Sequence, residues 1–370
     1  MNRREAERFL TALAEVRAGG GHAAVATVVR VHGSAYRREG TRMLVRPDGT
    51  YACSLSGGCL EPAVAATAAR VIETGVAAMV RYDLADDSIW SLNVGCSGAV
   101  DILIERIDDD PVTSTWLRVL ETGEPAVVVT PLSGATGRRV VFPDGRSEGT
   151  LSDPTLHEAV DDAARSALAA MPPRSVVSVV GSAELLFDVC EAPPALVVFG
   201  AGQDAVPLAR QGWALGFDVT VVDPRAAYLQ PDMFTGARLV LTPFDALSQH
   251  IALPPGASVV IMNHHLDRDR QALRFSLESA ADYIGVLGPR VRFERLLGDL
   301  ANEGFVPAAS ARARLHSPVG LAIGAETPDE VAMSILAEIV AIRRGFAGGP
   351  LDGTRGGLHR PSATSVLARS

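Results

Sequence analysis

The chain has 370 residues, of which 47% are hydrophobic and 21% are charged, and its formal net charge is −9. This composition is typical of a soluble globular protein that is long enough for two or three domains. The negative charge disfavours nucleic acid and anionic membranes as the main partner. All 34 basic residues are arginine, which excludes Schiff-base chemistry and a Walker-type phosphate loop, because both need a lysine.

The compartment follows from two further observations. No apolar run approaches the roughly 20 residues of a membrane-spanning helix, and the N-terminus lacks the apolar stretch of a signal peptide. We therefore expect a cytoplasmic protein whose cysteines are reduced thiols. These are Cys53, Cys59, Cys96 and Cys190.

The first part of the chain, residues 1–192, predicts an α+β domain. Its predicted helices are 3–17, 61–74 and 155–170. Its predicted strands are 23–31, 42–45, 99–106, 126–132, 139–142, 175–180 and 185–189. A proline-rich stretch at 191–194 ends this domain.

Residues 193–346 alternate buried strands with amphipathic helices, which predicts a Rossmann-like, doubly wound parallel sheet. The predicted strands are 195–199, 217–223, 237–241, 258–262 and 283–287. The predicted helices are 206–215, 244–250, 268–281, 290–303 and 328–343. The last stretch, 347–370, is rich in Gly, Ser, Arg and Pro, so we expect a disordered tail.

A glycine turn follows the first strand of this sheet. Gly200 and Gly202 open the next helix, and Asp223 ends the next strand, where an acidic side chain can bind a ribose hydroxyl. This pattern predicts a nucleotide or phosphate site, and a Rossmann-like turn that has lost its ligand is the alternative. His264 and His316 follow later strands at the same edge, and a structural hydrogen bond explains His316 equally well.

Two glycine-flanked thiols distinguish the first domain. Cys59, after Gly57 and Gly58, precedes a helix, where a thiolate or an anion is favoured. Cys96 lies in a second Gly-Cys turn. The pair indicates a soft-metal or sulfur-handling site, whereas a nucleophile with His32 as its partner, a zinc site, and plainly buried cysteines are the alternatives. Cys53 and Cys190 have apolar surroundings and are expected only to pack.

Three arginines lie on or beside a glycine-bounded loop at 33–42. Arg37, Arg38 and Arg42 suit the forked recognition of phosphate. A solvated surface loop is the competing interpretation.

These motifs together resemble the XdhC/CoxI family of molybdenum-cofactor maturation proteins. The resemblance covers nearly the whole chain apart from the tail. It rests on residues 33–38, 56–61, 95–98, 200–205, 222–225, 263–265, 316–325 and 327–339. The sequence departs from the family pattern at Ser97, Asn263 and Pro289.

The resemblance implies a two-domain chaperone that binds the molybdenum cofactor, a molybdopterin with or without an attached nucleotide. Such a protein protects the cofactor while a cysteine desulfurase supplies its sulfido ligand. It then inserts the cofactor into the large subunit of an apo-enzyme of the xanthine dehydrogenase or CO dehydrogenase type. It would be a maturation factor without turnover of its own, and a homodimer is expected.

By motif position, Cys59 and Cys96 would contact the metal. The other residues expected to bind a cofactor are Gly57, Gly58, Glu61, Arg37, Arg38, Arg42, Gly200, Gly202, Asp223 and His264. The main rival function is an NAD(P)-dependent oxidoreductase, because the Rossmann half can hold NAD(P) or another nucleotide. A thiol-dependent redox enzyme that uses the two cysteines is the third hypothesis.

Overall fold

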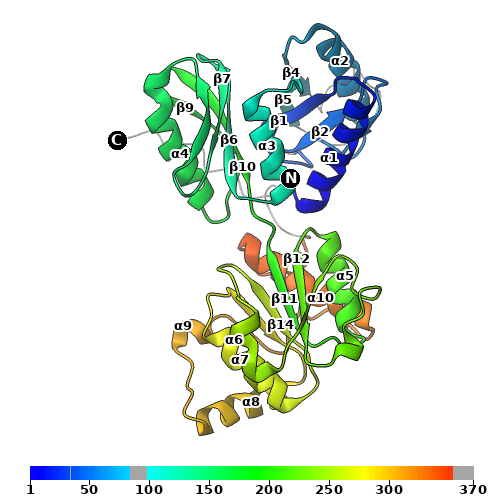
Figure 1. Cartoon of the computed structure of the whole chain (residues 1–370), viewed down its shortest axis with the longest axis vertical. Coiled ribbons are helices and arrows are strands. Elements are labelled where there is room, and N and C mark those ends of the chain that lie inside the picture. Colours follow the sequence, from blue (N-terminus) through cyan, green and yellow to red (C-terminus); the bar gives the residue numbers. More distant parts are fainter. Residues whose placement is uncertain (34, 84–97, 353–370) are drawn as a thin grey trace. The chain divides into compact units, whose positions relative to one another are not determined.

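A computed structural model describes residues 1–33, 35–83 and 98–352 of the chain. The chain divides into two compact units, of which one comprises Met1–Ala192 and the other Pro193–Pro350 (Figure 1). Of the tail predicted at 347–370, only the part up to residue 352 is described. Among the helices within these ranges, none is long and apolar enough to cross a membrane.

The described residues of the first unit form two antiparallel sheets of five strands. The first sheet has the order β3-β2-β1-β5-β4. Its strands are β1 (Ala24–Gly33), β2 (Arg42–Val45), β3 (Tyr51–Ala52), β4 (Ala78–Asp83) and β5 (Gly98–Arg106). The second sheet has the order β8-β7-β6-β10-β9. Its strands are β6 (Ala126–Ser133), β7 (Gly137–Val141), β8 (Ser147–Leu151), β9 (Val176–Val180) and β10 (Ala183–Cys190).

Alternating side chains give each of these sheets two apolar faces. In β1, Ala24, Ala26 and Val28 pack with helix α2 (Glu61–Thr74), whereas Val25 joins a core on the opposite face. In β6, Val127 and Val129 pack with helix α4 (His157–Ala169), which follows the 3-10 turn η1 (Pro154–Leu156).

The inner faces of the two sheets share a large hydrophobic core. Residues of both sheets meet there with the helices α1 (Arg3–Ala18) and α3 (Pro111–Thr122). Within this core the rings of Phe9 and Trp116 contact each other edge to face, with centroids 5.6 Å apart. The α+β character predicted for this half is therefore realised as two sheets with helices packed against them.

The second unit confirms the predicted Rossmann-like fold. Its six parallel strands have the order β13-β12-β11-β14-β15-β16. They are β11 (Ala195–Phe199), β12 (Asp218–Asp223), β13 (Arg238–Leu241), β14 (Ser258–Ile261), β15 (Tyr283–Val286) and β16 (Leu315–His316). This order reverses direction between β11 and β14, and α/β sheets bind ligands at the carboxyl ends of the strands at that point.

Helices cover both faces of the parallel sheet. They are α5 (Ala205–Ala214), α6 (Leu247–His250), α7 (Leu266–Leu277), α8 (Arg290–Asn302), α9 (Ala309–Arg312) and α10 (Pro328–Arg344), with the 3-10 turns η2 (Ala226–Tyr228) and η3 (Phe244–Ala246). Leu196 and Val198 of β11 face α5 and α10, whereas Val197 and Phe199 face α7 and α8. Helix α10 begins with a capping box formed by Thr327 and Glu330.

Candidate functional site

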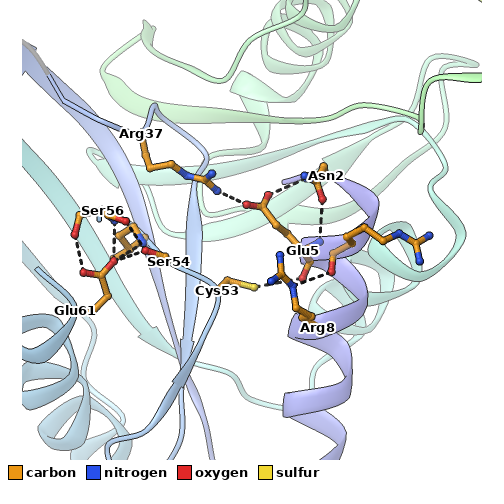
Figure 2. A network of polar contacts seen from close by, with 10 residues as sticks. Asn2, Glu5, Arg8, Arg37, Cys53, Ser54, Ser56 and Glu61 are labelled. Carbon is orange, nitrogen blue, oxygen red and sulfur yellow. Dashed lines mark hydrogen bonds and ion pairs between the residues drawn. The ribbon is translucent and has the colours of Figure 1, made fainter. Parts of the chain in front are cut away.

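The loop that carries Cys59 is held in place by the carboxylate of Glu61 (Figure 2). Glu61 is the first residue of α2 and is 1% exposed. Its Oε1 accepts hydrogen bonds from Ser54 Oγ at 2.5 Å, from the Leu55 amide at 3.0 Å and from the Ser56 amide at 2.8 Å. Its Oε2 accepts one from Ser56 Oγ at 2.6 Å. The carboxylate predicted to contact a cofactor therefore fixes the backbone of the loop.

Burial and hydrogen bonding act on Glu61 in opposite directions. Burial alone raises the pKa of this carboxyl, but the hydrogen bonds from Ser54 and Ser56 outweigh it and hold the pKa below its ordinary value. The group is therefore a charged acceptor at neutral pH.

The thiol of Cys59 lies within reach of this carboxylate network. Its Sγ donates to Ser56 Oγ at 3.3 Å, and the same oxygen accepts from the Leu60 amide at 3.2 Å. Cys59 is half-buried and is not part of a disulfide. It directly precedes Leu60, the N-cap of α2, which makes no side-chain capping bond, so the thiol lies at the positive end of the helix.

Two glycines leave the space beside Cys59 open. Gly57 and Gly58 are exposed, and apart from their chain neighbours no described residue has an atom within 4 Å of a Cβ added to either. Gly58 also has φ of +113°, which disfavours a side chain there. The described residues therefore leave this side of the loop open.

The three arginines predicted to bind an anion differ in their surroundings. Arg37 pairs with Glu5, whose carboxylate also takes part in the capping box of α1 (Figure 2). Arg38 has a buried Nε with no hydrogen-bond partner in the described part of the chain. The loop residue Ala35 and Cys59 pack against the same hydrophobic cluster.

Arg42 does not have the free, exposed guanidinium expected of an anion ligand, and this expectation needs correction. It lies in β2, where its side chain is 6% exposed and forms an ion pair with Asp188 of β10. Its guanidinium also lies 4.9 Å from the ring centre of Trp116. A buried guanidinium that is already paired belongs to the core between the sheets and is not available to a ligand.

The remaining thiols and His32 have separate environments. Cys190 is buried in the core shared by the two sheets, as predicted. Cys53 follows β3 with φ of +65°, and its Sγ donates to the Glu5 carbonyl at 3.3 Å. Burial, together with Glu5, raises the pKa of the Cys53 thiol. His32, the partner considered for a cysteine nucleophile, contacts Asp101 at 3.0 Å.

The second cysteine loop cannot be compared with its prediction. Cys96, with its neighbours Gly95 and Ser97, lies outside the described residues. Within the described residues, no group of three His, Cys, Asp or Glu side chains is arranged to hold a metal ion.

In the second unit, Gly200 has a steric reason to be glycine. Its φ is +113°, and a Cβ there would lie 2.7 Å from the Met262 carbonyl oxygen. The turn therefore passes directly against the end of β14. At Gly202, a Cβ would lie 2.6 Å from Asp204 Oδ1.

Asp223, predicted to bind a ribose hydroxyl, is completely buried, and both of its carboxylate oxygens are engaged. Oδ2 accepts from the Ala201 amide at 2.9 Å and from Arg225 Nη2 at 2.8 Å, and Oδ1 accepts from Arg225 Nε at 2.8 Å. Burial raises the pKa of Asp223, but the Arg225 hydrogen bonds outweigh it and the net pKa is lowered. The carboxylate orients the turn and Arg225 and offers no free oxygen to a ribose.

His264 makes a contact that sequence reasoning missed. Its Nε2 lies 2.7 Å from Asp204 Oδ2, although 60 residues separate the two in the chain. The imidazole is 65% exposed, and the backbone of His264 has φ of +57°. Asp204 lies inside the glycine motif, but nothing in the motif identifies its partner.

The contacts of His316 agree with a structural hydrogen bond, one of the two interpretations of this residue. Its ring stacks on Tyr283 at 4.4 Å, and its Nδ1 lies 3.5 Å from Glu338 of α10. Glu338 also accepts from the Tyr283 hydroxyl and, at 2.9 Å, from the Gly320 amide. Burial and Glu338 raise the pKa of Tyr283.

The fold and these sites define a class of protein in which a two-sheet unit carrying a loop thiol precedes a Rossmann-like unit. Residues 196–339 match the XdhC Rossmann domain, and residues 16–83 match the XdhC and CoxI family. The chain is 32% identical over 330 residues to a probable xanthine dehydrogenase subunit of Bacillus subtilis, covering 88% of this chain and 94% of that protein. The chain belongs to the XdhC and CoxI family.

Two further relatives agree with this assignment. The molybdenum cofactor insertion chaperone PaoD of Escherichia coli is 24% identical over 325 residues, which is 87% of this chain and 83% of PaoD. A crystal structure described as a xanthine dehydrogenase from Bacillus halodurans superposes with a TM-score of 0.75 at 27% identity, covering 91% of this chain and 96% of that one.

Proposed function

We propose that this protein is a maturation factor that binds the molybdenum cofactor, protects it during sulfuration and inserts it into an apo-molybdoenzyme of the xanthine dehydrogenase or CO dehydrogenase type. The observation that carries the proposal is the half-exposed Cys59 thiol, held at the start of α2 by the Ser56 and Glu61 network. The names of two relatives, a molybdenum cofactor insertion chaperone and a probable xanthine dehydrogenase subunit, support the same cargo.

The chemistry of the loop suits this cargo. A cysteine sulfur is a soft ligand that suits a sulfur-coordinated metal, and the start of α2 favours nearby anionic groups. Among the described residues, the space beside Gly57 and Gly58 is open. In this proposal Arg38, whose buried Nε has no partner among the described residues, contacts an anionic group of the cargo.

The proposal also names partners. A cysteine desulfurase supplies the sulfur, the large subunit of the apo-enzyme receives the cofactor, and the chaperone acts as a cytoplasmic homodimer. Cys96 is proposed as the second thiol that contacts the molybdenum end. The protein itself then turns over no substrate, because its role is to hold and transfer.

The test is anaerobic retention of purified molybdenum cofactor, measured by ultrafiltration and molybdenum analysis. Wild type should retain molybdenum, and Cys59→Ser should lose most of it, because serine keeps the contact to Ser56 but removes the soft ligand. Cys53→Ser is the matched control on the same segment and should retain the metal. Cys96→Ser examines the second thiol separately.

Two results would contradict the proposal. The first is a folded wild-type protein that retains no molybdenum. The second is equal retention by wild type, Cys59→Ser and Cys96→Ser, which would remove the thiols from the site.

A further inference from the structure

Helix α10 directs its polar side chains towards its own unit. Between residues 331 and 342 its sequence contains two polar residues, Ser334 and Glu338. Ser334 is 5% exposed, and its Oγ donates to the Leu321 carbonyl at 2.7 Å. Glu338 is half-buried and accepts from the Gly320 amide at 2.9 Å. Both polar groups are therefore used inside the Rossmann-like unit and add little polarity to the outer face of the helix.

The middle of this outer face is apolar. Met333 is 53% exposed, Val340 is 39% exposed, and Ala337 between them is also exposed. Their spacing of four and three residues places them on one stripe of the helix. The other side of the helix packs in the core through Ile335 and Ile339. A surface helix normally presents polar side chains to water, so an apolar outer stripe indicates a contact surface.

Opposite charges stand at the two ends of the stripe. Glu330 precedes Met333 by three residues and Arg344 follows Val340 by four, so both continue the same stripe, and both are exposed. Backbone hydrogen bonds of the capping box lower the pKa of Glu330, which keeps it charged at neutral pH. Fourteen residues separate the two charges, which is about 21 Å along the helix.

A stripe with this order of charges is complementary to a second copy of itself. In an antiparallel pair with a two-fold axis at Ala337, Glu330 of each copy meets Arg344 of the other. Met333 then faces Val340, and the small side chain of Ala337 lets the helices approach at the axis. A parallel pair would bring like charges together at both ends. The alternation of three and four residues is also the spacing of a coiled-coil seam.

We propose that α10 forms the contact between two copies of this chain, as an antiparallel helix pair with its two-fold axis at Ala337. The inference rests on the homodimer of the proposed function and names the surface that forms it. The apolar residues supply the buried area, and the terminal charges set the antiparallel direction. Because α10 belongs to the Rossmann-like unit, the contact joins the second units of the two copies.

The test is the molar mass of the full chain in solution, measured by sedimentation equilibrium over a range of concentrations. Wild type should be a dimer. Ala337→Glu places two carboxylates against each other at the axis and should raise the Kd of the dimer by about a hundredfold or more. Glutamate favours helix, so this variant should keep the circular dichroism of wild type. The control is Val291→Glu on α8, where Val291 is 77% exposed outside the stripe, and this variant should remain dimeric.

Two further variants examine the charges and the geometry. Arg344→Glu places a carboxylate beside Glu330 at both ends of the pair. It should raise the Kd by about tenfold, and the rise should become smaller at high salt. Ala337→Cys brings two thiols together at the axis, so mild oxidation should cross-link this variant more completely than Val291→Cys.

Three results would overturn the inference. They are a folded wild type that is monomeric at every concentration, an Ala337→Glu protein that dimerises as wild type does, and equal cross-linking of Ala337→Cys and Val291→Cys. Molybdenum retention depends on the Cys59 loop and is measured separately. A wild type that retains molybdenum while Ala337→Glu stays dimeric contradicts this inference alone. Loss of the dimer in Ala337→Glu, with no molybdenum retained by wild type, contradicts the proposed cargo alone.

Discussion

The hydroxyl of Ser56 donates to Glu61 Oε2 at 2.6 Å and, through its oxygen, accepts from the thiol of Cys59 at 3.3 Å. One serine thereby connects a buried carboxylate with the thiol on which the proposed cargo site depends. The loop and the first turn of α2 form one hydrogen-bonded unit, so removal of the Glu61 charge should affect them together.

We predict that Glu61→Gln lowers the free energy of unfolding by about 1–3 kcal/mol. The amide nitrogen cannot accept hydrogen bonds, and the neutral oxygen accepts more weakly than a carboxylate. Urea unfolding measures the change, with Glu73→Gln, an exposed position on the same helix, as the control. Equal stability of the two variants would contradict the role assigned to Glu61.

The pH dependence of the free energy of unfolding should reveal the ionisation of Glu61. The pKa of Glu61 is lower in the folded chain than its ordinary value of 4.5. The contribution of the Glu61 carboxylate to the free energy of unfolding is therefore complete above the pKa of the unfolded chain. It is lost as the pH falls through the lower pKa of the folded chain. Urea unfolding between about pH 6 and pH 3 should show a steeper acid loss in wild type than in Glu61→Gln. Parallel curves would exclude a lowered pKa.

Gly200→Ala should destabilise the second unit by about 1–3 kcal/mol. The new Cβ would lie 2.7 Å from the Met262 carbonyl oxygen at a positive φ, and backbone on both sides restricts relief. Gly298→Ala is the control, because Gly298 lies inside α8 with open space at its Cβ position and alanine favours helix. Thermal unfolding should give a lower Tm for Gly200→Ala than for Gly298→Ala. A Gly200→Ala protein as stable as wild type would contradict the close approach of Gly200 to the Met262 carbonyl.

The ion pair between Arg42 and Asp188 allows a double-mutant test. Arg42→Leu leaves the carboxylate of Asp188, which is 2% exposed, without its partner, and should cost about 3–5 kcal/mol. Adding Asp188→Leu should recover much of that loss, because no unpaired charge then remains in the core. Chemical unfolding of the four proteins gives the coupling energy. Additive effects would indicate that the two groups do not interact.

Much of the fold could be predicted from the sequence where local pattern and burial agree. The strand 195–199 and the helix 61–74 were predicted at their observed bounds, because apolar residues fill both and a proline or glycine marks each end. Helix α3 was missed because Val112, Thr113, Thr115 and Val119 are weak helix formers. Its signals were the cap Asp110 and the following Pro111.

The site residues were harder to predict than the fold. Arg42 and Asp223 were recognised as chemically relevant, but their partners decide what they do. Asp188 lies 146 residues from Arg42, and no local pattern indicates such a pair. The contact between Asp204 and His264 depends in the same way on two strands that the fold alone brings together.

The position of β5 between β1 and β4 in the first sheet affects how the unit can be divided. Strand β4 pairs with β5, which in turn pairs with β1, so residues 98–106 lie between segments that precede them in the chain. A fragment limited to the family segment 16–83 would lack this strand, and also Trp116 and Phe142 of the shared core. The two sheets should therefore melt in a single cooperative transition.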